Sequence, residues 1–229
     1  NQWSSLGLQT VWITGDEARE QEPLLTTEIC AAVAVPEEAQ IHAHQVVQAF
    51  SRAASNAGAH IVPQQEVMGI QSMNEHVTGV LLSDQTRIAC EHLVIAAGAW
   101  SLHCGTWLHI DLPIRPVGGQ ILSLSQPSQP LRHLIFGEGI YLVPRGKTIL
   151  VGATKEDVGF HVRVTSQGVS WLQTTAERLL PSLKQSRIER AWAGVRPATP
   201  DKHPLLGSVP RWNNVTLATG HNSVGIILS

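Results

Sequence analysis

The chain has 229 residues, of which 43% are hydrophobic and 15% charged, so it is long enough for one large domain or two smaller ones. A formal net charge of −2 argues against nucleic acid or an anionic membrane surface as a partner, because both attract strongly basic proteins. No apolar run reaches the roughly 18 residues that a membrane-spanning helix needs. The three cysteines, Cys30, Cys90 and Cys104, are odd in number and widely spaced, which favours a reducing, cytoplasmic setting over a disulfide scaffold.

The two ends of the sequence do not resemble the ends of a finished domain. The N-terminal stretch lacks the basic and apolar regions of a signal peptide. The last residues, Ile226, Ile227 and Leu228, form an apolar run that would be costly to expose. We therefore expect a part of a longer chain, or a chain that needs a partner segment.

The first half of the chain predicts a helix, a hairpin and a return strand. Residues 16–23 are predicted to form a short helix that ends at Pro23, and Glu17, Glu20, Glu22 and Glu28 around it are expected to form a solvated face. Residues 41–58 have helical apolar spacing, with Gly58 at the C-terminal cap. Short apolar runs then predict strands at 60–62, 66–73, 76–82 and 87–97, the last ending in small residues at 96–98.

The second half is rich in strands. Residues 114–125, 133–139, 140–145 and 147–156 are β-branched runs separated by Gly and Pro, which is typical of an antiparallel sheet. A helix is predicted to begin with Thr165 or Ser166 as its N-cap and to end at Pro181. Two more strands are expected within 187–207 and 214–229. These elements predict an α+β fold.

The eleven histidines raise the question of a metal site. On a helix, His42 and His44 would point about 200° apart, since each residue turns by about 100°. The neighbours His103 and Cys104 would diverge on a strand. We therefore predict no metal site, and a metal-dependent hydrolase stays an alternative that elemental analysis would test.

Several segments occur together in the order found in one family of flavoenzymes. They are IAAGAWS at 95–101, IRPVGGQ at 114–120, EGIYLVPRG at 138–146, LVGATKEDVGF at 150–160, AWAGVRPATPDKHPLLG at 191–207 and ATGHNSVGIILS at 218–229. As a set they resemble the D-amino-acid oxidase superfamily of FAD-dependent oxidoreductases, and most of all its glycine oxidases, which are associated with thiamine biosynthesis. The resemblance extends from about Leu6 to Ser229. In that family a strand–GxGxxG–helix unit at the N-terminus holds the ADP half of FAD, and no GxGxxG follows a predicted strand here.

The resemblance implies how the chain is divided. We expect an antiparallel substrate-domain sheet with flanking helices, together with an incomplete FAD-binding α/β domain. Residues 1–40 would begin the substrate domain, and 41–104 would form part of the FAD-binding domain. Residues 105–193 would form the antiparallel substrate domain, and 194–229 the C-terminal part of the FAD-binding domain.

The resemblance also implies the site residues, with FAD as cofactor. Arg196 and Tyr141 would hold the substrate carboxylate, with Ser223 beside them; arginine suits this role because its planar fork binds a carboxylate through two hydrogen bonds. Taken singly, Arg196 could equally be a structural ion-pair residue and Tyr141 a core residue. The backbone of Val67 would meet the adenine. The other implied cofactor-binding residues are Ala96, Ala97, Gly98, Trp100, Gly194, Gly220, His221, Asn222, Ser223, Val224, Gly225 and Ile226. No residue is implied as a catalytic acid or base.

Two departures from the family pattern lie close to these residues. Many relatives have an arginine at the position of Gly118. Glycine oxidases often have an aromatic residue and an arginine at Asn222 and Ser223.

The expected reaction is the FAD-dependent oxidative deamination of glycine, or of a small amine or D-amino acid, to an imino acid and hydrogen peroxide. One alternative is a truncated, non-catalytic fragment that folds without flavin. A second is a D-amino-acid dehydrogenase that passes electrons to a carrier. A homo-oligomer and a missing N-terminal segment both remain open as partners.

Overall fold

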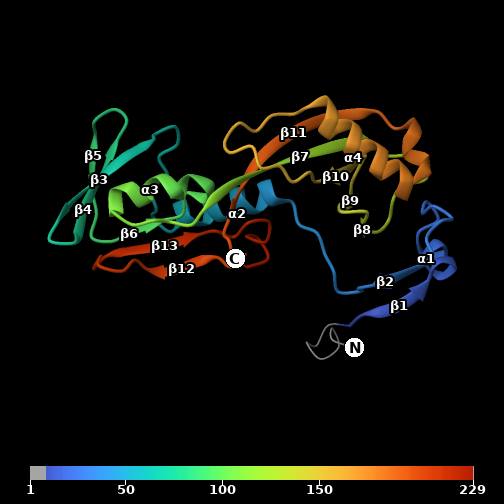
Figure 1. Ribbon diagram of the computed structural model, residues 1–229, viewed down its shortest axis with the longest axis horizontal. Coiled ribbons are helices and arrows are strands. Elements are labelled where there is room, and N and C mark those ends of the chain that lie inside the picture. The colour runs from blue at the N-terminus through green and yellow to red at the C-terminus, as the bar shows by residue number, and fades with distance from the viewer. Residues whose placement is uncertain (1–8, 229) are drawn as a thin grey trace. The chain divides into compact units, whose positions relative to one another are not determined.

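The computed structural model describes residues 9–228, so predictions for residues 1–8 and 229 lie outside the described part of the chain. The chain forms two compact units, each assembled from separate stretches (Figure 1). Unit 1 combines Asn1–Ile41, Gly118–Glu156 and His161–Gly194. Unit 2 combines His42–Val117, Asp157–Phe160 and Val195–Ser229. The expected boundary at 104/105 falls inside a helix of unit 2, and the identification of the units as substrate and FAD-binding domains remains a prediction.

Unit 1 is built on a five-stranded sheet with the order β11-β7-β10-β9-β8. The strands are β7 (Arg115–Ser125), β8 (Ile135–Gly137), β9 (Ile140–Arg145), β10 (Thr148–Gly152) and β11 (Ile188–Ala198). Strand β10 pairs antiparallel with β7 and β9, and β8 pairs antiparallel with β9, as the sequence predicted.

One helix covers a face of this sheet and completes its core. Helix α4 (Ser166–Leu179) begins at the N-cap Thr165, whose hydroxyl accepts the N–H of Gly168 at 3.1 Å, and a 3₁₀ turn, η3 (Pro181–Gln185), follows it. Helix α4 lies beside the strands of this sheet (Figure 1). Leu172 and Ala176 on α4 are fully buried in one cluster with Leu142 of β9 and side chains of β7 and β10. The predicted N-cap and the predicted stop at Pro181 are both confirmed.

The N-terminal part of unit 1 holds β1 (Val11–Thr14), α1 (Gly15–Gln21) and β2 (Ala31–Ala34); β1 and β2 pair antiparallel and had not been predicted. The expectation that Glu22 lies on a solvated face is wrong, because its side chain is only 2% exposed. Its Oε2 accepts the backbone N–H groups of Arg132 and His133 at 2.9 and 3.0 Å. The carboxylate therefore ties the end of α1 to the loop before β8.

Unit 2 contains a helix, α2 (Ala43–Asn56), and two three-stranded sheets. The first sheet is an antiparallel meander of β3 (Val67–Met73), β4 (His76–Leu82) and β5 (Arg87–Ala89). The second has the order β12-β13-β6, in which β6 (Leu93–Ile95) pairs parallel with β13 (Val215–Thr219), and β12 (Leu205–Ser208) pairs antiparallel with β13.

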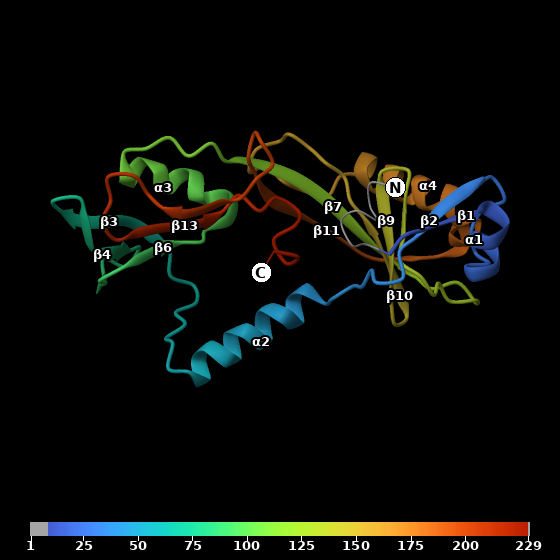
Figure 2. The ribbon, with the colours of Figure 1, turned by 90° about the horizontal axis from the view of Figure 1, so that it is seen from below.

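Helix α3 (Ser101–Leu108) follows a single 3₁₀ turn, η2 (Gly98–Trp100), and lies over the β6–β13 pair (Figure 2). Cys104 and Leu108 of α3 pack with Ile95 of β6 and with Val215 and Leu217 of β13. No helix within residues 9–228 is long and apolar enough to cross a membrane.

Two strand predictions in this region need correction. The strand expected at 87–97 is two strands, β5 and β6, which belong to different sheets because the chain turns at residues 90–92. No strand forms at 60–62, where Pro63 lacks a backbone donor and Gln64 has a φ of 60°, so that the chain turns at once. The predicted strands at 66–73 and 76–82 are confirmed as β3 and β4.

The amide of Asn214 joins the two sheets of unit 2. Its Oδ1 accepts the N–H of Val77 at 2.8 Å, and its Nδ2 donates to the carbonyl oxygens of Val77 and Glu91, both at 2.7 Å. Its main-chain carbonyl accepts the N–H of Leu93 at 2.9 Å. Asn214 is 4% exposed, so these bonds are shielded from water.

We expect Asn214→Leu to lower the free energy of unfolding by about 3 kcal/mol or more, because each buried backbone group left unpaired costs about 1–3 kcal/mol. Urea unfolding followed by tryptophan fluorescence measures the change. The exposed neighbour Asn213→Ala is the control and should stay within about 0.5 kcal/mol of the unchanged protein. A loss below about 1 kcal/mol for Asn214→Leu would contradict this role.

Candidate functional site

Two segments that the sequence assigned to cofactor binding lie at one edge of a sheet. Strands β6 and β13 are parallel, with Leu93 opposite Val215 and Ile95 opposite Leu217, so their carboxyl ends face the same way. Residues 96–98 follow β6 directly, and residues 220–226 follow β13. Ligands of parallel α/β sheets bind outside the carboxyl ends of the strands, so both segments stand where a ligand is expected.

Buried hydroxyl groups join these two segments. Thr219 Oγ1 donates to the carbonyl oxygen of Gly98 at 3.0 Å, and Ser101 Oγ lies 3.0 Å from Thr219 Oγ1. Gly98 has a φ of 55°, which only glycine adopts readily, and the chain turns there into η2. The turn after β6 is therefore held to the last residue of β13.

The 220–226 loop lies against the end of β11. Gly220 has a φ of 78°, and a Cβ atom there would lie 2.8 Å from Cγ2 of Thr199, so both the backbone conformation and the space require glycine. The N–H of Asn222 donates to the carbonyl oxygen of Pro197 at 3.0 Å. The loop is thus anchored one residue beyond Arg196, which is half-buried, while Ser223 is exposed.

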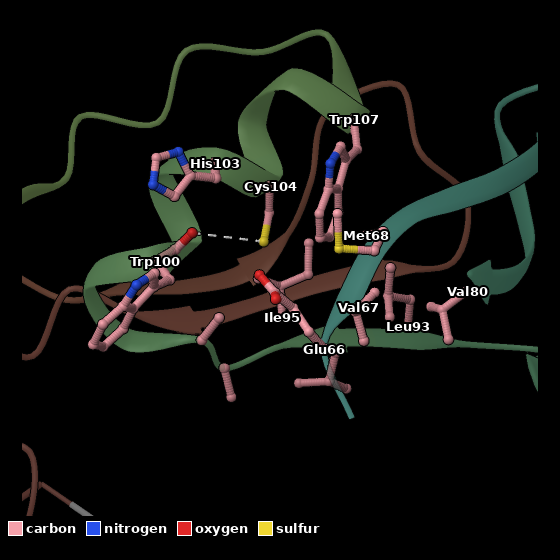
Figure 3. Close-up of a pocket in the computed structure, with 13 residues that line it drawn as sticks. Glu66, Val67, Met68, Val80, Leu93, Ile95, Trp100, His103, Cys104 and Trp107 are labelled. Atoms are coloured by element: carbon pink, nitrogen blue, oxygen red, sulfur yellow. Dashed lines mark hydrogen bonds between the residues drawn. The ribbon is translucent and has the colours of Figure 1, made fainter. Parts of the chain in front are cut away.

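A mostly apolar pocket of about 580 Å³ opens beside β6 and below α3 (Figure 3). Its volume falls within the range of about 300–1,000 Å³ that is usual for small-molecule sites. The lining residues are Glu66, Val67, Met68, Val80, Leu93, Val94, Ile95, Ala96, Ala97, Trp100, His103, Cys104 and Trp107. Four of the predicted cofactor-binding residues, Val67, Ala96, Ala97 and Trp100, are therefore brought together in one cavity.

An aromatic contact that the sequence did not reveal supports one wall of this pocket. The ring of Phe160 lies 5.3 Å from the ring of Trp100 and 5.3 Å from that of His103, measured between centroids. Arg115 forms an ion pair with Asp157 at 2.9 Å, three residues before Phe160. Segment 157–160, which belongs to unit 2, thus contacts other parts of that unit through both of its end residues. The motif LVGATKEDVGF contains Asp157 and Phe160, but no regular spacing in the sequence connects them with Trp100.

Four further predicted site residues, two in each unit, do not line this pocket. Tyr141 and Gly194 belong to unit 1, whereas Arg196 and Ser223 belong to unit 2. Tyr141 is half-buried on β9, with its ring 6.2 Å from that of Phe136. Gly194 is exposed on β11. The roles of these four residues remain predictions.

The pocket lining includes one thiol, that of Cys104. Burial raises the pKa of the Cys104 thiol, and its Sγ lies 3.9 Å from the carbonyl oxygen of Trp100. Cys104 is therefore a neutral, apolar part of the pocket lining at neutral pH. Among residues 9–228, no group of three or more His, Cys, Asp or Glu side chains is placed to hold a metal ion.

Comparison with known proteins identifies the family. Residues 1–229 match the DAO family, described as FAD dependent oxidoreductase. The chain belongs to this family. Its relatives include the glycine oxidase of Geobacillus kaustophilus, with 35% identity over 99% of this chain and 60% of the relative. They also include a bifunctional protein ThiO/ThiG of a Nostoc species, with 36% identity over 95% of this chain and 33% of the relative.

Solved structures agree with this assignment. The crystal structure of glycine oxidase from Bacillus cereus superposes with a TM-score of 0.93 at 33% identity, and covers 99% of this chain but 62% of the crystallised one. The mixed helix-and-sheet architecture predicted from the sequence is therefore confirmed. The chain spans about 60% of the length of the glycine oxidases that it matches.

We expect Cys104 to react with iodoacetamide at pH 7.5 at least about tenfold more slowly than Cys30, because a raised pKa and burial both reduce the reactive thiolate. Cys30 is exposed and serves as the internal reference. Peptide mass spectrometry of partly alkylated protein gives both rates at once. Equal rates would show that the Cys104 thiol is open to solvent.

Proposed function

We propose that this chain carries the substrate sheet and part of the flavin site of a glycine oxidase-like enzyme. The reaction would be oxidative deamination of glycine, or of a small amine or D-amino acid, to an imino acid with release of hydrogen peroxide. The observation that carries the proposal is the meeting of segments 96–98 and 220–226 at the carboxyl ends of two parallel strands. The relatives named glycine oxidase and ThiO/ThiG support it, and they also support a role in thiamine biosynthesis.

The residues of unit 2 fit a flavin nucleotide. Ala96 and Ala97 are exposed towards the pocket and carry only methyl groups, so a ligand can approach their backbone closely. The apolar walls offered by Val67 and Trp100 suit a flat ring system. Residues 220–226 would complete the site from β13. When bound, FAD supplies the acceptor for the hydride that leaves the substrate α-carbon.

The chain's own contribution to the reaction would be binding and orientation. Arg196 would hold the substrate carboxylate in a bidentate ion pair, and Tyr141 would donate a further hydrogen bond to it. Ser223 would lie beside the bound substrate. A carboxylate fixed in this way presents the Cα–H in one direction, and such positioning supplies much of the rate of a reaction whose chemistry belongs to a cofactor. No acid or base from the protein is required if the amine binds in its neutral form.

Part of the apolar surface of unit 2 is uncovered among the described residues. Within the described residues β6 is the last strand of its sheet, and Val94 on it is 56% exposed. Val47 and Phe50 of α2 are each 64% exposed. We propose that an N-terminal segment with a GxGxxG unit covers these surfaces, since the chain spans only about 60% of its glycine oxidase relatives. A homo-oligomer would instead bury them between copies, and a measured molar mass separates the two.

The open edge of β6 also favours the second candidate, a non-catalytic fragment that folds without flavin. In that case the pocket walls would be stable although the nucleotide is absent.

The first test is colour. We expect the purified chain, incubated with FAD and then desalted, to retain absorption in the flavin bands and to release hydrogen peroxide under air with glycine, sarcosine or D-alanine. A colourless chain would support the non-catalytic alternative. A coloured chain that reduces an artificial electron acceptor but yields no peroxide would support a dehydrogenase.

In flavin-loaded protein we expect Arg196→Ala to raise the KM for an amino-acid substrate by about tenfold or more, because a bidentate carboxylate contact is lost. Steady-state kinetics with glycine measures the change. Arg187→Ala is the matched control, since the Arg187 side chain is 84% exposed and pairs only with Glu189 at 3.4 Å among the ion pairs described. An unchanged KM for Arg196→Ala would remove this residue from the substrate site.

A further inference from the structure

Two hydroxyl groups lie behind the loops of the proposed flavin site without lining the pocket. Ser101 is 0% exposed and Thr219 is 1% exposed. Ser101 is the first residue of α3, and Thr219 is the last residue of β13. Neither residue lines the pocket, although Ala97 and Trp100 close to Ser101 do. Any effect of these hydroxyls on a ligand must therefore pass through the loops that they hold.

The chemistry of the contact allows only one arrangement of the hydrogens. The carbonyl oxygen of Gly98 can only accept, so the single hydroxyl hydrogen of Thr219 is donated to it at 3.0 Å. Thr219 Oγ1 can then only accept from Ser101, which lies 3.0 Å away. The carbonyl of Gly98 also accepts the backbone N–H of Ser101. The result is a closed set of directional bonds that fixes the carbonyl of Gly98.

This set of bonds fixes the distance between the two loops. Gly98 ends the small-residue turn after β6, and Thr219 directly precedes Gly220, where the second loop begins. Apolar packing between β6, β13 and α3 holds these elements together but has no directional preference. The hydroxyl pair adds direction, because a buried acceptor without its donor is strongly unfavourable.

We propose that Thr219, supported by Ser101, is a positioning residue that sets the spacing between the 96–98 turn and the 220–226 loop for flavin binding. The inference rests on the proposed function, because it assigns the two loops to one ligand. Thr219 does so without lining the pocket, since it is 1% exposed and its one hydroxyl hydrogen is donated to Gly98.

The test compares three variants of the 229-residue chain. Thr219→Val keeps the branched shape and removes the hydroxyl, Thr219→Ser keeps the hydroxyl, and Ser101→Ala removes only the outer donor. Hydrogen exchange followed by mass spectrometry, without flavin, reports on peptides that cover 96–101 and 220–226. Peptides from β9 in unit 1 provide an internal reference. Titration with FAD, followed by flavin fluorescence, gives the dissociation constant.

We expect Thr219→Val to speed exchange in both loop peptides by about tenfold and to weaken FAD binding by about tenfold, with β9 unchanged, since one buried acceptor loses its donor. Thr219→Ser should restore both values to within about twofold of the unchanged chain. Ser101→Ala should have a smaller effect than Thr219→Val, because the bond from Thr219 to Gly98 survives.

The outcomes separate the two proposals. Exchange and FAD binding in Thr219→Val equal to those of the unchanged chain would overturn the positioning role and leave the proposed function standing. Weakened binding that Thr219→Ser fails to restore would also overturn it, because the hydroxyl would not be the cause. An unchanged chain that binds no FAD would overturn the proposed function, and the flavin role of Thr219 with it.

Discussion

The pocket depends on the amide of Asn214, because its walls belong to two different sheets. Strands β3 and β4 supply Val67, Met68 and Val80, whereas β6 supplies Leu93 and its neighbours. Apolar contacts alone would not fix the position of one sheet relative to the other, since such contacts are not directional. The side-chain hydrogen bonds of Asn214 to Val77 and Glu91, together with its main-chain bond to Leu93, fix the meander against the parallel pair. Buried polar groups of this kind make one arrangement of a core more stable than its alternatives.

The chemistry of the pocket follows from this construction. Its shape comes from backbone turns and from methyl and indole groups, and its one thiol is held neutral by burial. In the proposed function, such a pocket would accept a flat cofactor by close backbone approach and would leave the electron chemistry to that cofactor. Asn214, Thr219 and Phe160 lie outside the pocket lining. Each of them fixes an element that carries lining residues.

Local sequence patterns predicted the elements whose causes are local. Thr165 and Pro181 mark the ends of α4 through local effects. The Thr165 hydroxyl caps the first turn, and a proline lacks the backbone N–H that a continuing helix needs. The meander strands β3 and β4 follow from apolar runs. The break between β5 and β6 could not be predicted from local sequence, because the carbonyl oxygen of Glu91, between the two strands, accepts a hydrogen bond from Asn214, more than 100 residues later.

The same distinction applies to the site. The resemblance to glycine oxidases pointed to Val67, Ala96, Ala97 and Trp100, which line one pocket. It did not point to His103, Cys104 and Trp107. These residues lie on α3, a helix that the sequence patterns did not predict. The contacts of Ser101 and Phe160 join distant parts of the chain, so no spacing within a single window could indicate them.

The interleaving of the two units has a consequence for the order in which the chain can fold as it is made. The chain passes between the units near residues 41, 117, 156, 160 and 194. Strand β6 leaves the ribosome more than 100 residues ahead of β13, its parallel neighbour, and ahead of the Asn214 amide. Until then its apolar residues have no strand beside them, which slows folding and favours wrong association. The main sheet of unit 1 has its last strand, β11, before β13 is made, so all its strands are present while β6 still lacks its parallel neighbour.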